Sequence, residues 1–221
     1  MNDNVKMPPV ICAYYTDNYK NEVETLKESL DKLGITYYVK RYESRGYWEA
    51  NTCIKPEFLL ECLDRFPGRS IVYLDADAVV RKPLSLFDNI EADIGVFHCS
   101  DAGGFSHKYL TGTIFIANNS KSRLFIKDWI ECQRGVWLGV DQDSFDKAMA
   151  INKDLSVFNL PESYVKIFDR TGADAVIEHF QASRKKVKLQ RFIKKLRNAC
   201  IIIFAVSLVY WFLVSKLAHL M

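Results

Sequence analysis

Hydrophobic and polar positions along the first part of the chain follow two different periods. Residues 10–16, VICAYYT, are almost all apolar, which is typical of a buried strand. Residues 20–33 instead place apolar side chains at helical spacing and are followed by Gly34, a common helix terminator. Residues 35–42, ITYYVKRY, again indicate a strand. The pattern therefore predicts a strand, a helix and a second strand.

The same order continues along the chain. Residues 56–66 form a predicted helix that is opened by Pro56 and closed by Pro67 and Gly68. Residues 70–75 then form a third predicted strand, which ends at an aspartate. Strands that alternate with helices in this way imply a parallel, doubly wound sheet with right-handed crossovers. Ligands bind such sheets beyond the carboxyl ends of the strands.

The rest of the body continues the α/β pattern. We expect a further helix over 121–133 and shorter strands over 93–98, 112–117, 155–160 and 175–179. The expected fold class is therefore α/β, with a mostly parallel, Rossmann-like sheet flanked by helices. The 221 residues are enough for one domain of generous size, and we place that domain at residues 1–183.

Charge divides the chain in two. Residues 1–183 carry 21 Lys and Arg against 27 Asp and Glu, whereas nine Lys and Arg and no acidic residue follow from residue 184. An acidic body with a basic tail is not typical of a nucleic-acid-binding protein, so we expect no nucleic-acid partner. None of the six cysteines belongs to a Cys-x-x-Cys pair, which favours reduced thiols and a reducing compartment.

The tail has the pattern of a membrane anchor. Residues 184–198 predict a basic amphipathic helix on an anionic membrane surface. Its apolar positions at helical spacing are Leu189, Phe192, Ile193 and Leu196. Residues 199–218 are the predicted hydrophobic anchor, and positive charge on its N-terminal side predicts a body that faces the cytoplasm. A buried core helix is the alternative, and the pattern leaves open whether the anchor spans the bilayer or lies in it.

Two carboxylates stand at the end of the third predicted strand. The sequence IVYLDADAVV, residues 71–80, places Asp75 and Asp77 one residue apart. Carboxylates this close repel each other, and a divalent cation such as Mg²⁺ or Mn²⁺, which prefers hard oxygen ligands, offsets the repulsion. The pair therefore predicts a metal site, and a metal at a strand end most often holds phosphate. A helix or turn cap at the strand end is the alternative.

The segment around these aspartates resembles a known family. IVYLDADAVVRKPLSLF is similar to the signature of GT-A-fold glycosyltransferases, in particular the glycogenin and lipopolysaccharide galactosyltransferase-like group. The resemblance implies that Asp75 and Ala76 hold a nucleotide sugar and that a metal on Asp75 and Asp77 bridges its diphosphate. It covers residues 10–185 and implies a GT-A-like fold with glycosyltransferase activity of the hexosyltransferase type.

Other parts of the chain match the family pattern in the same order. Tyr15 and Thr16 stand where the family cradles the nucleotide base and ribose. Lys55 resembles the family's basic residue before the helix that precedes the metal motif. Gly112 and Thr113, in LTGTIFIAN, stand in the strand that faces the donor sugar. The resemblance therefore implies that these five residues contact the nucleotide sugar.

The closing motif of the family is matched by VIEHFQASRK, residues 176–185. The resemblance implies that His179 is the third protein ligand of the metal and that Lys185 contacts the diphosphate. A neutral imidazole with two carboxylates is a good Mn²⁺ ligand set. On the residues alone, His179 is also consistent with a structural histidine, and Lys185 with the start of the basic tail. The departures from the family are Ala182 in place of a glycine and Thr111-Gly112-Thr113 in place of an Asn-containing turn.

Asp141, Gln142 and Asp143 are the candidate catalytic residues. They lie in VDQDSFDKAM, residues 140–149, which resembles the family's Asp-Gln-containing helix start beside the sugar. In an inverting transferase one carboxylate would be the general base for the acceptor hydroxyl. In the retaining group that the chain resembles no base is needed, and Gln142 or Asp141 would stabilise an oxocarbenium-like centre. Acidic residues that complement a helix dipole are the alternative.

The expected function is that of a metal-dependent glycosyltransferase. It would move a sugar from a nucleotide-diphosphate donor, UDP in preference to GDP, to a hydroxyl of a glycan or lipid-linked acceptor. The resemblance favours retention of configuration. Two alternatives stay open. A haloacid-dehalogenase-type phosphatase would use Asp75 as a covalent nucleophile and Asp77 as the acid or base, and a membrane-tethered module would bind a sugar nucleotide without catalysis.

Overall fold

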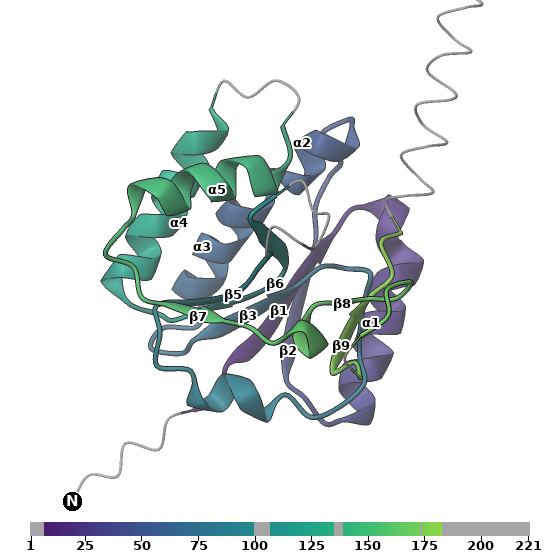
Figure 1. The fold of residues 1–221 in the computed structure, drawn as a ribbon. Helices are drawn as coiled ribbons and strands as arrows, with labels where there is room; N and C mark the ends of the chain where they lie inside the picture. The colour runs from purple at the N-terminus through teal and green to yellow at the C-terminus, as the bar shows by residue number, and fades with distance from the viewer. Residues whose placement is uncertain (1–6, 100–106, 135–138, 173, 183–221) are drawn as a thin grey trace, which may run out of the picture. The chain divides into compact units, whose positions relative to one another are not determined.

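A six-stranded sheet forms the centre of the fold (Figure 1). The computed structural model describes residues 7–99, 107–134, 139–172 and 174–182. The strand order in the sheet is β2-β1-β3-β6-β5-β7. The strands are β1 (Val10–Tyr15), β2 (Tyr37–Arg41), β3 (Ile71–Leu74), β5 (Ile94–His98), β6 (Tyr109–Ile116) and β7 (Val157–Asn159).

Helices flank this sheet, with α3, α4 and α5 grouped on one side of it and α1 on the other (Figure 1). The helices are α1 (Lys20–Lys32), α2 (Trp48–Thr52), α3 (Lys55–Arg65), α4 (Ser120–Gln133) and α5 (Asp141–Ile151). Short 3₁₀ helices in the described residues are η1 (Asp17–Tyr19), η2 (Ser85–Asn89) and η4 (Glu162–Tyr164). The predicted α/β fold class, a sheet flanked by helices, is confirmed.

The sheet is mixed. β1 runs parallel to β2 and β3, as the order of strands and helices predicts, with α1 and α3 in the connections. β6 runs antiparallel to β3 and β5, and β7 runs parallel to β5. Only residues 99–108 connect β5 to β6, which is too short for a crossover helix, so the two strands pair as antiparallel neighbours. The carboxyl end of β3 therefore lies beside the middle of β6, where Leu74 pairs with Thr113.

Alternate residues of β1 belong to two hydrophobic cores. Val10 and Cys12 pack with aromatic and aliphatic side chains of α3, α4 and α5. Ile11 and Ala13 pack on the other face with leucines of α1. A strand that is buried on both faces has to be apolar at successive positions. This double burial explains why the first strand was recognisable as an unbroken apolar run.

A second sheet has the strand order β4-β9-β8 and lies beside α1 (Figure 1). Its strands are β4 (Ala78–Val80), β8 (Lys166–Ile167) and β9 (Ile177–His179). β4 pairs antiparallel with β9, which puts Ala78 opposite His179. The Val80 amide donates a hydrogen bond of 3.0 Å to the Ser29 hydroxyl, so β4 is fixed on α1. β9 matches the strand expected over 175–179, whereas β4 and β8 are too short to leave a periodic signal in the sequence.

The segments expected at the membrane lie outside the described residues. These are the predicted basic helix over 184–198 and the predicted anchor over 199–218. Within the described ranges, no helix combines the length and the apolar character needed to cross a membrane. Residues Met1–Gln181 form one compact unit, and the candidate site described next belongs to it.

Candidate active site

The two aspartates lie in the tight turn between β3 and β4, at the carboxyl end of a central strand. The Asp75 amide donates a hydrogen bond of 2.9 Å to the Gly112 carbonyl of β6, and the Ala78 amide donates one of 3.0 Å back to the Asp75 carbonyl. On the other side of the turn, the Phe180 amide donates to the Asp77 carbonyl at 3.2 Å. The backbone thus holds the end of β9 against the turn, and brings His179 to it.

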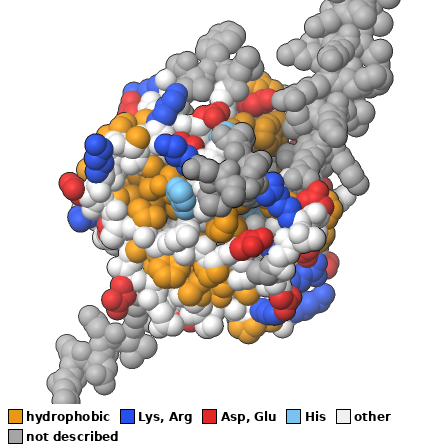
Figure 2. All heavy atoms as spheres, viewed as in Figure 1, with side chains coloured by type: hydrophobic (Ala, Val, Ile, Leu, Met, Phe, Trp, Pro, Cys, Tyr) orange, Lys and Arg blue, Asp and Glu red, His pale blue; other side chains and the backbone are white. Residues whose placement is uncertain are grey.

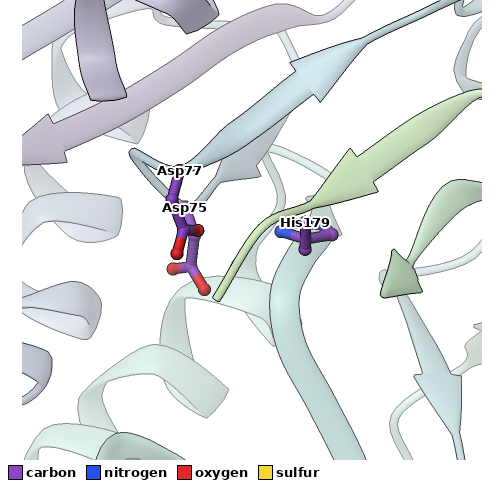
Figure 3. A group of neighbouring side chains, drawn as sticks. All are labelled: Asp75, Asp77 and His179. Atoms are coloured by element: carbon purple, nitrogen blue, oxygen red, sulfur yellow. The ribbon is translucent and has the colours of Figure 1, made fainter. Parts of the chain in front are cut away.

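Asp75, Asp77 and His179 form one cluster (Figure 3). Each side chain offers one ligand atom, and these atoms lie within 4.8 Å of one another. Two carboxylate oxygens and an imidazole nitrogen are a donor set that suits Mn²⁺ and also accepts Mg²⁺. The Asp75 side chain is 38% exposed, so the cluster can be reached from solvent. The residues that the sequence predicted as metal ligands are therefore brought together.

Gly112 leaves room beside this cluster. A Cβ atom at this position would lie 3.0 Å from His179 Cε1 and 3.1 Å from Asp75 Oδ2, closer than nearly all real contacts. The glycine is therefore needed for space, because any side chain would push the imidazole or the carboxylate aside. Gly112 lies in the middle of β6, and its carbonyl accepts the hydrogen bond from the Asp75 amide, so this strand borders the site.

His179 is held from beneath by Thr113. The imidazole Nε2 and the Thr113 hydroxyl lie 2.8 Å apart, and both residues are buried. Burial lowers the pKa of His179 to about 4; the negative charge of Asp75 opposes the shift, and the positive charge of Lys55 adds to it. The imidazole is therefore neutral at neutral pH, which is the form that binds metals. A hydrogen bond to one ring nitrogen fixes the orientation of the other.

Lys55, at the beginning of α3, is a buried cation between two carboxylates. Its Nζ lies 2.6 Å from Asp141 Oδ2 and 3.1 Å from Asp75 Oδ1, and the side chain is only 4% exposed. It also donates to the Thr111 carbonyl at 3.0 Å. Burial opposes the charge on Lys55, but Asp141 and Asp75 outweigh it and raise the pKa of the amine above its usual value. Lys55 thus ties the metal motif to α5.

The three candidate catalytic residues occupy the first turn of α5 but differ in their surroundings. Asp141 is buried, and its Oδ2 accepts a hydrogen bond of 2.7 Å from the Thr111 hydroxyl in addition to the ion pair with Lys55. Asp143 accepts a hydrogen bond of 3.0 Å from the Val140 amide, which caps the helix. Gln142 and Asp143 are partly exposed. Asp141 therefore holds the turn in place, Asp143 contacts the Val140 amide and His107, and the side chain of Gln142 is partly exposed.

The residues expected to bind the nucleotide sugar lie around the same edge. Tyr15 is the last residue of β1, next to β3, and Thr16 follows it; Thr16 is buried while Tyr15 is partly exposed. Ala76 lies between Asp75 and Asp77 in the turn that joins β3 to β4, called the metal turn below. Lys185, expected at the diphosphate, lies outside the described residues. Lys55 and Thr113, described above, are buried against the metal ligands, so the structure places them beneath the cluster.

Two neighbours of the cluster went unnoticed in the sequence. The Tyr73 hydroxyl donates a hydrogen bond of 2.8 Å to Asp75 Oδ1. Residues two apart in a strand share a face, so the position of Tyr73 was available from the pattern. Tyr19 of η1 is the second neighbour of the cluster. Burial raises the pKa of its phenol, and the nearby negative charges of Asp77 and Asp75 raise it further. Only the three-dimensional arrangement reveals Tyr19.

Solved structures of glycosyltransferases resemble this chain in fold. One is a glycosyltransferase involved in the glycosylation of the major capsid of PBCV-1; it is 16% identical, has a TM-score of 0.61, and the match covers 79% of this chain and 94% of that one. The glycosyltransferase GlyE of Streptococcus pneumoniae TIGR4 is 14% identical with a TM-score of 0.54, and the match covers 79% of this chain but only 55% of GlyE. The fold is that of the GT-A glycosyltransferases.

A third GT-A structure is the galactosyltransferase LgtC, solved in complex with donor and acceptor sugar analogs. It is 15% identical with a TM-score of 0.50, and the match covers 78% of this chain and 87% of LgtC. No protein-family model and no curated protein sequence matches the chain. The GT-A fold confirms the structural side of the resemblance drawn from the motifs. It lends no support to the phosphatase interpretation, which requires a different domain around its Asp-x-Asp strand.

Proposed function

We propose that this protein is a metal-dependent glycosyltransferase. It would take a sugar from a nucleotide-diphosphate donor, UDP in preference to GDP, and transfer it with retention to a hydroxyl group of a glycan or lipid-linked acceptor. The observation that carries the proposal is the cluster of Asp75, Asp77 and His179 at the carboxyl edge of a GT-A sheet. The structural neighbours support sugar transfer as the class of reaction.

The cluster would hold Mn²⁺ or Mg²⁺ through Asp75, Asp77 and His179. Bound there, the ion would neutralise the charge that develops on a leaving diphosphate. Lys185, six residues beyond His179 in the sequence, would place a positive charge on the same diphosphate. Thr113 and Lys55 would keep His179 and Asp75 in position, which is a common role of groups just behind metal ligands.

The nucleotide part of the donor would lie along the ends of β1 and β3. Tyr15 and Thr16 would hold the base and ribose, because they stand at the carboxyl end of β1, the neighbour of the strand that leads to Asp75. Gly112 leaves room for His179 and Asp75, and the small side chain of Ala76 would let the donor approach the backbone of the turn. This placement follows the general rule that α/β sheets bind ligands beyond the carboxyl ends of their strands.

The sugar would face the first turn of α5. Asp141 is engaged by Lys55 and Thr111, so it would fix the turn, while the partly exposed Gln142 would stabilise positive charge at the reacting carbon. Stabilising that charge in a site already arranged for it is the main way in which such a centre lowers a barrier. The retaining outcome remains part of the proposal.

The acceptor and the location follow from the tail. Residues 184–198 would bind an anionic membrane surface and residues 199–218 would anchor the chain, with the body facing the cytoplasm. An enzyme held at the membrane meets acceptors there at high effective concentration. The proposed acceptor is therefore a lipid-linked or envelope glycan.

The proposal is tested by turnover of sugar nucleotides. The full chain, purified in detergent, is incubated with UDP-glucose, UDP-galactose and the corresponding GDP-sugars. Water takes the sugar in place of the unidentified acceptor, and release of the nucleoside diphosphate is measured with Mn²⁺ and with EDTA. Release is expected from a UDP-sugar, with Mn²⁺ only. Asp77→Asn should abolish it, whereas Asp154→Asn, which changes an exposed carboxylate far from the cluster in sequence, should not.

Three outcomes separate the alternatives. Metal-dependent release that Asp77→Asn removes supports the transferase. Nucleotide binding without any release would identify a non-catalytic binding module. Hydrolysis of phosphate monoesters with Mg²⁺, with no response to sugar nucleotides, would favour the phosphatase and overturn the proposal.

A further inference from the structure

Two phenylalanine rings stack on the surface beside the candidate metal site. Phe168 follows β8 and Phe180 follows β9; the ring centroids are 5.6 Å apart, and the planes are inclined by only 14°. Phe168 is 45% exposed and Phe180 is 39% exposed. Single apolar side chains are common on protein surfaces, but two large rings in contact expose a continuous apolar patch. The pair is small for an interaction surface, so its role has to be argued from what surrounds it.

The aromatic pair lies on the face of the small sheet opposite to His179. The Phe168 amide donates a hydrogen bond of 3.1 Å to the His179 carbonyl, and the Phe180 amide donates to the Asp77 carbonyl, so both residues extend their strands. Successive side chains of a strand point to opposite faces. Because His179 points into the metal cluster, Phe180 points away from it, at the same end of β9.

An ion pair lies beside the aromatic pair. The Arg81 guanidinium lies 5.8 Å from the centre of the Phe180 ring and pairs with Glu178 at 2.8 Å. Figure 2 likewise shows basic and acidic side chains interspersed on the side where Figure 1 places α1 and the small sheet. The patch therefore offers apolar area without a strong net charge.

The sequence after Phe180 indicates what covers this patch. Three residues separate Phe180 from Arg184, so the four Cα-to-Cα steps between them span at most ~14 Å. From Arg184 the chain carries nine Lys and Arg and no acidic residue, and residues 199–215 are uncharged. When residues 184–198 bind an anionic bilayer surface, Phe180 cannot lie farther from that surface than this short connection allows. Aromatic rings this close to a bilayer are stabilised when they enter the boundary between headgroups and acyl chains.

We infer that the Phe168–Phe180 pair is a membrane-docking surface that enters the headgroup region of an anionic lipid bilayer. The inference rests on the proposed attachment of the tail to the membrane, and it adds the orientation of the body relative to the bilayer. The end of β9 faces the bilayer, and His179 lies one residue from the docking surface. The acceptor hydroxyl is accordingly one that a lipid carries close to the headgroups. A soluble glycan would not require the metal cluster to lie so close to the bilayer surface.

Photocrosslinking of the full chain tests this orientation. Benzoylphenylalanine replaces Phe168 or Phe180 one at a time, and the matched control replaces Leu124 of α4, which is 56% exposed. The chain is bound to vesicles of phosphatidylcholine with roughly one third phosphatidylglycerol, separated by flotation, irradiated and examined by mass spectrometry for lipid adducts. We expect lipid adducts at positions 168 and 180 at several times the yield at position 124.

The outcomes separate the docking surface from the proposals on which it rests. Flotation with equal lipid yields at positions 168, 180 and 124 overturns the docking surface and leaves the tail as an anchor. Crosslinks from position 168 or 180 to a second copy of the chain overturn it in favour of self-association. Failure to float contradicts membrane attachment and the docking surface together, and metal-dependent release of UDP, measured separately, is independent of all three results.

Discussion

Lys55 Nζ lies 2.6 Å from Asp141 Oδ2 and 3.1 Å from Asp75 Oδ1, so a single buried ammonium group joins the metal turn to the first turn of α5. Asp75 comes from the end of β3 and Asp141 from the start of α5. The candidate metal ligand and the candidate catalytic turn are therefore positioned by the same cation. Removing it should disturb both.

Lys55→Met should destabilise the protein strongly. The variant leaves the buried Asp141 carboxylate without its cation, and breaking a buried ion pair in this way costs about 3–5 kcal/mol. Urea unfolding measures the loss. The control is Lys40→Met, since Lys40 and Glu61 form an ion pair that is 37% exposed on both sides. That change should cost under about 1 kcal/mol, and equal losses in the two variants would contradict the role of Lys55.

Thr113→Val should weaken metal binding without removing a ligand. Valine keeps the shape of threonine but cannot bond to His179 Nε2, so the imidazole loses its fixed orientation. Loss of such a partner lowers metal affinity by roughly 10–100-fold. Isothermal titration with Mn²⁺ measures the change. Thr25→Val, which alters an exposed threonine of α1, is the control and should bind Mn²⁺ as the wild type does; unchanged affinity in Thr113→Val would remove Thr113 from the site.

Gly112→Ala should abolish or sharply reduce Mn²⁺ binding. The added methyl group would lie 3.0 Å from His179 Cε1 and 3.1 Å from Asp75 Oδ2, so one of the two ligands must move. Gly95→Ala is the matched control, because its methyl group would meet Phe115 Cβ at 3.1 Å within the core. That variant should lose stability and keep its Mn²⁺ affinity per folded molecule. The reverse pattern would show that Gly112 does not border the metal.

Without metal, the protein should lose stability as the pH falls from about 6.5 towards 4. The pKa of His179 is lowered to about 4 in the folded state, chiefly by burial. The unfolded chain therefore binds a proton in this window that the folded chain does not, and the contribution is about 3 kcal/mol at most. Urea unfolding in EDTA at several pH values measures the slope. His179→Gln should flatten it and His98→Gln, on an exposed histidine, should not; identical slopes in all three proteins would contradict the shift.

The sequence was most informative where burial or chemistry produces a recognisable pattern within a few consecutive residues. The first strand is buried on both faces and is apolar at every position, and the Asp75-Ala76-Asp77 turn ends a strand as the motif predicts. His179 was found only through its resemblance to a family motif. Nothing local marks a histidine in a three-residue strand as the partner of a distant turn.

The contacts beneath the site depend on strand register, which no single segment encodes. Thr111 reaches Asp141, and Thr113 reaches His179, because β6 reverses direction and pairs with β3 in one register. A shift of one residue would turn these side chains to the other face. The sequence also placed Lys55 at the nucleotide sugar, whereas the structure buries it between two carboxylates. Whether it also touches the donor stays a prediction.

The most direct test of the central claim is the melting temperature of the full chain in detergent with nucleotides, with Mn²⁺ or EDTA. A ligand that binds only the folded state stabilises it, by about 2.7 kcal/mol at one hundred times its dissociation constant. We predict that UDP with Mn²⁺ raises the melting temperature and that EDTA or Asp77→Asn removes the rise. A chain that no nucleoside diphosphate stabilises in Mn²⁺, or a rise that persists in Asp77→Asn, would contradict a metal-dependent nucleotide-sugar site at Asp75, Asp77 and His179.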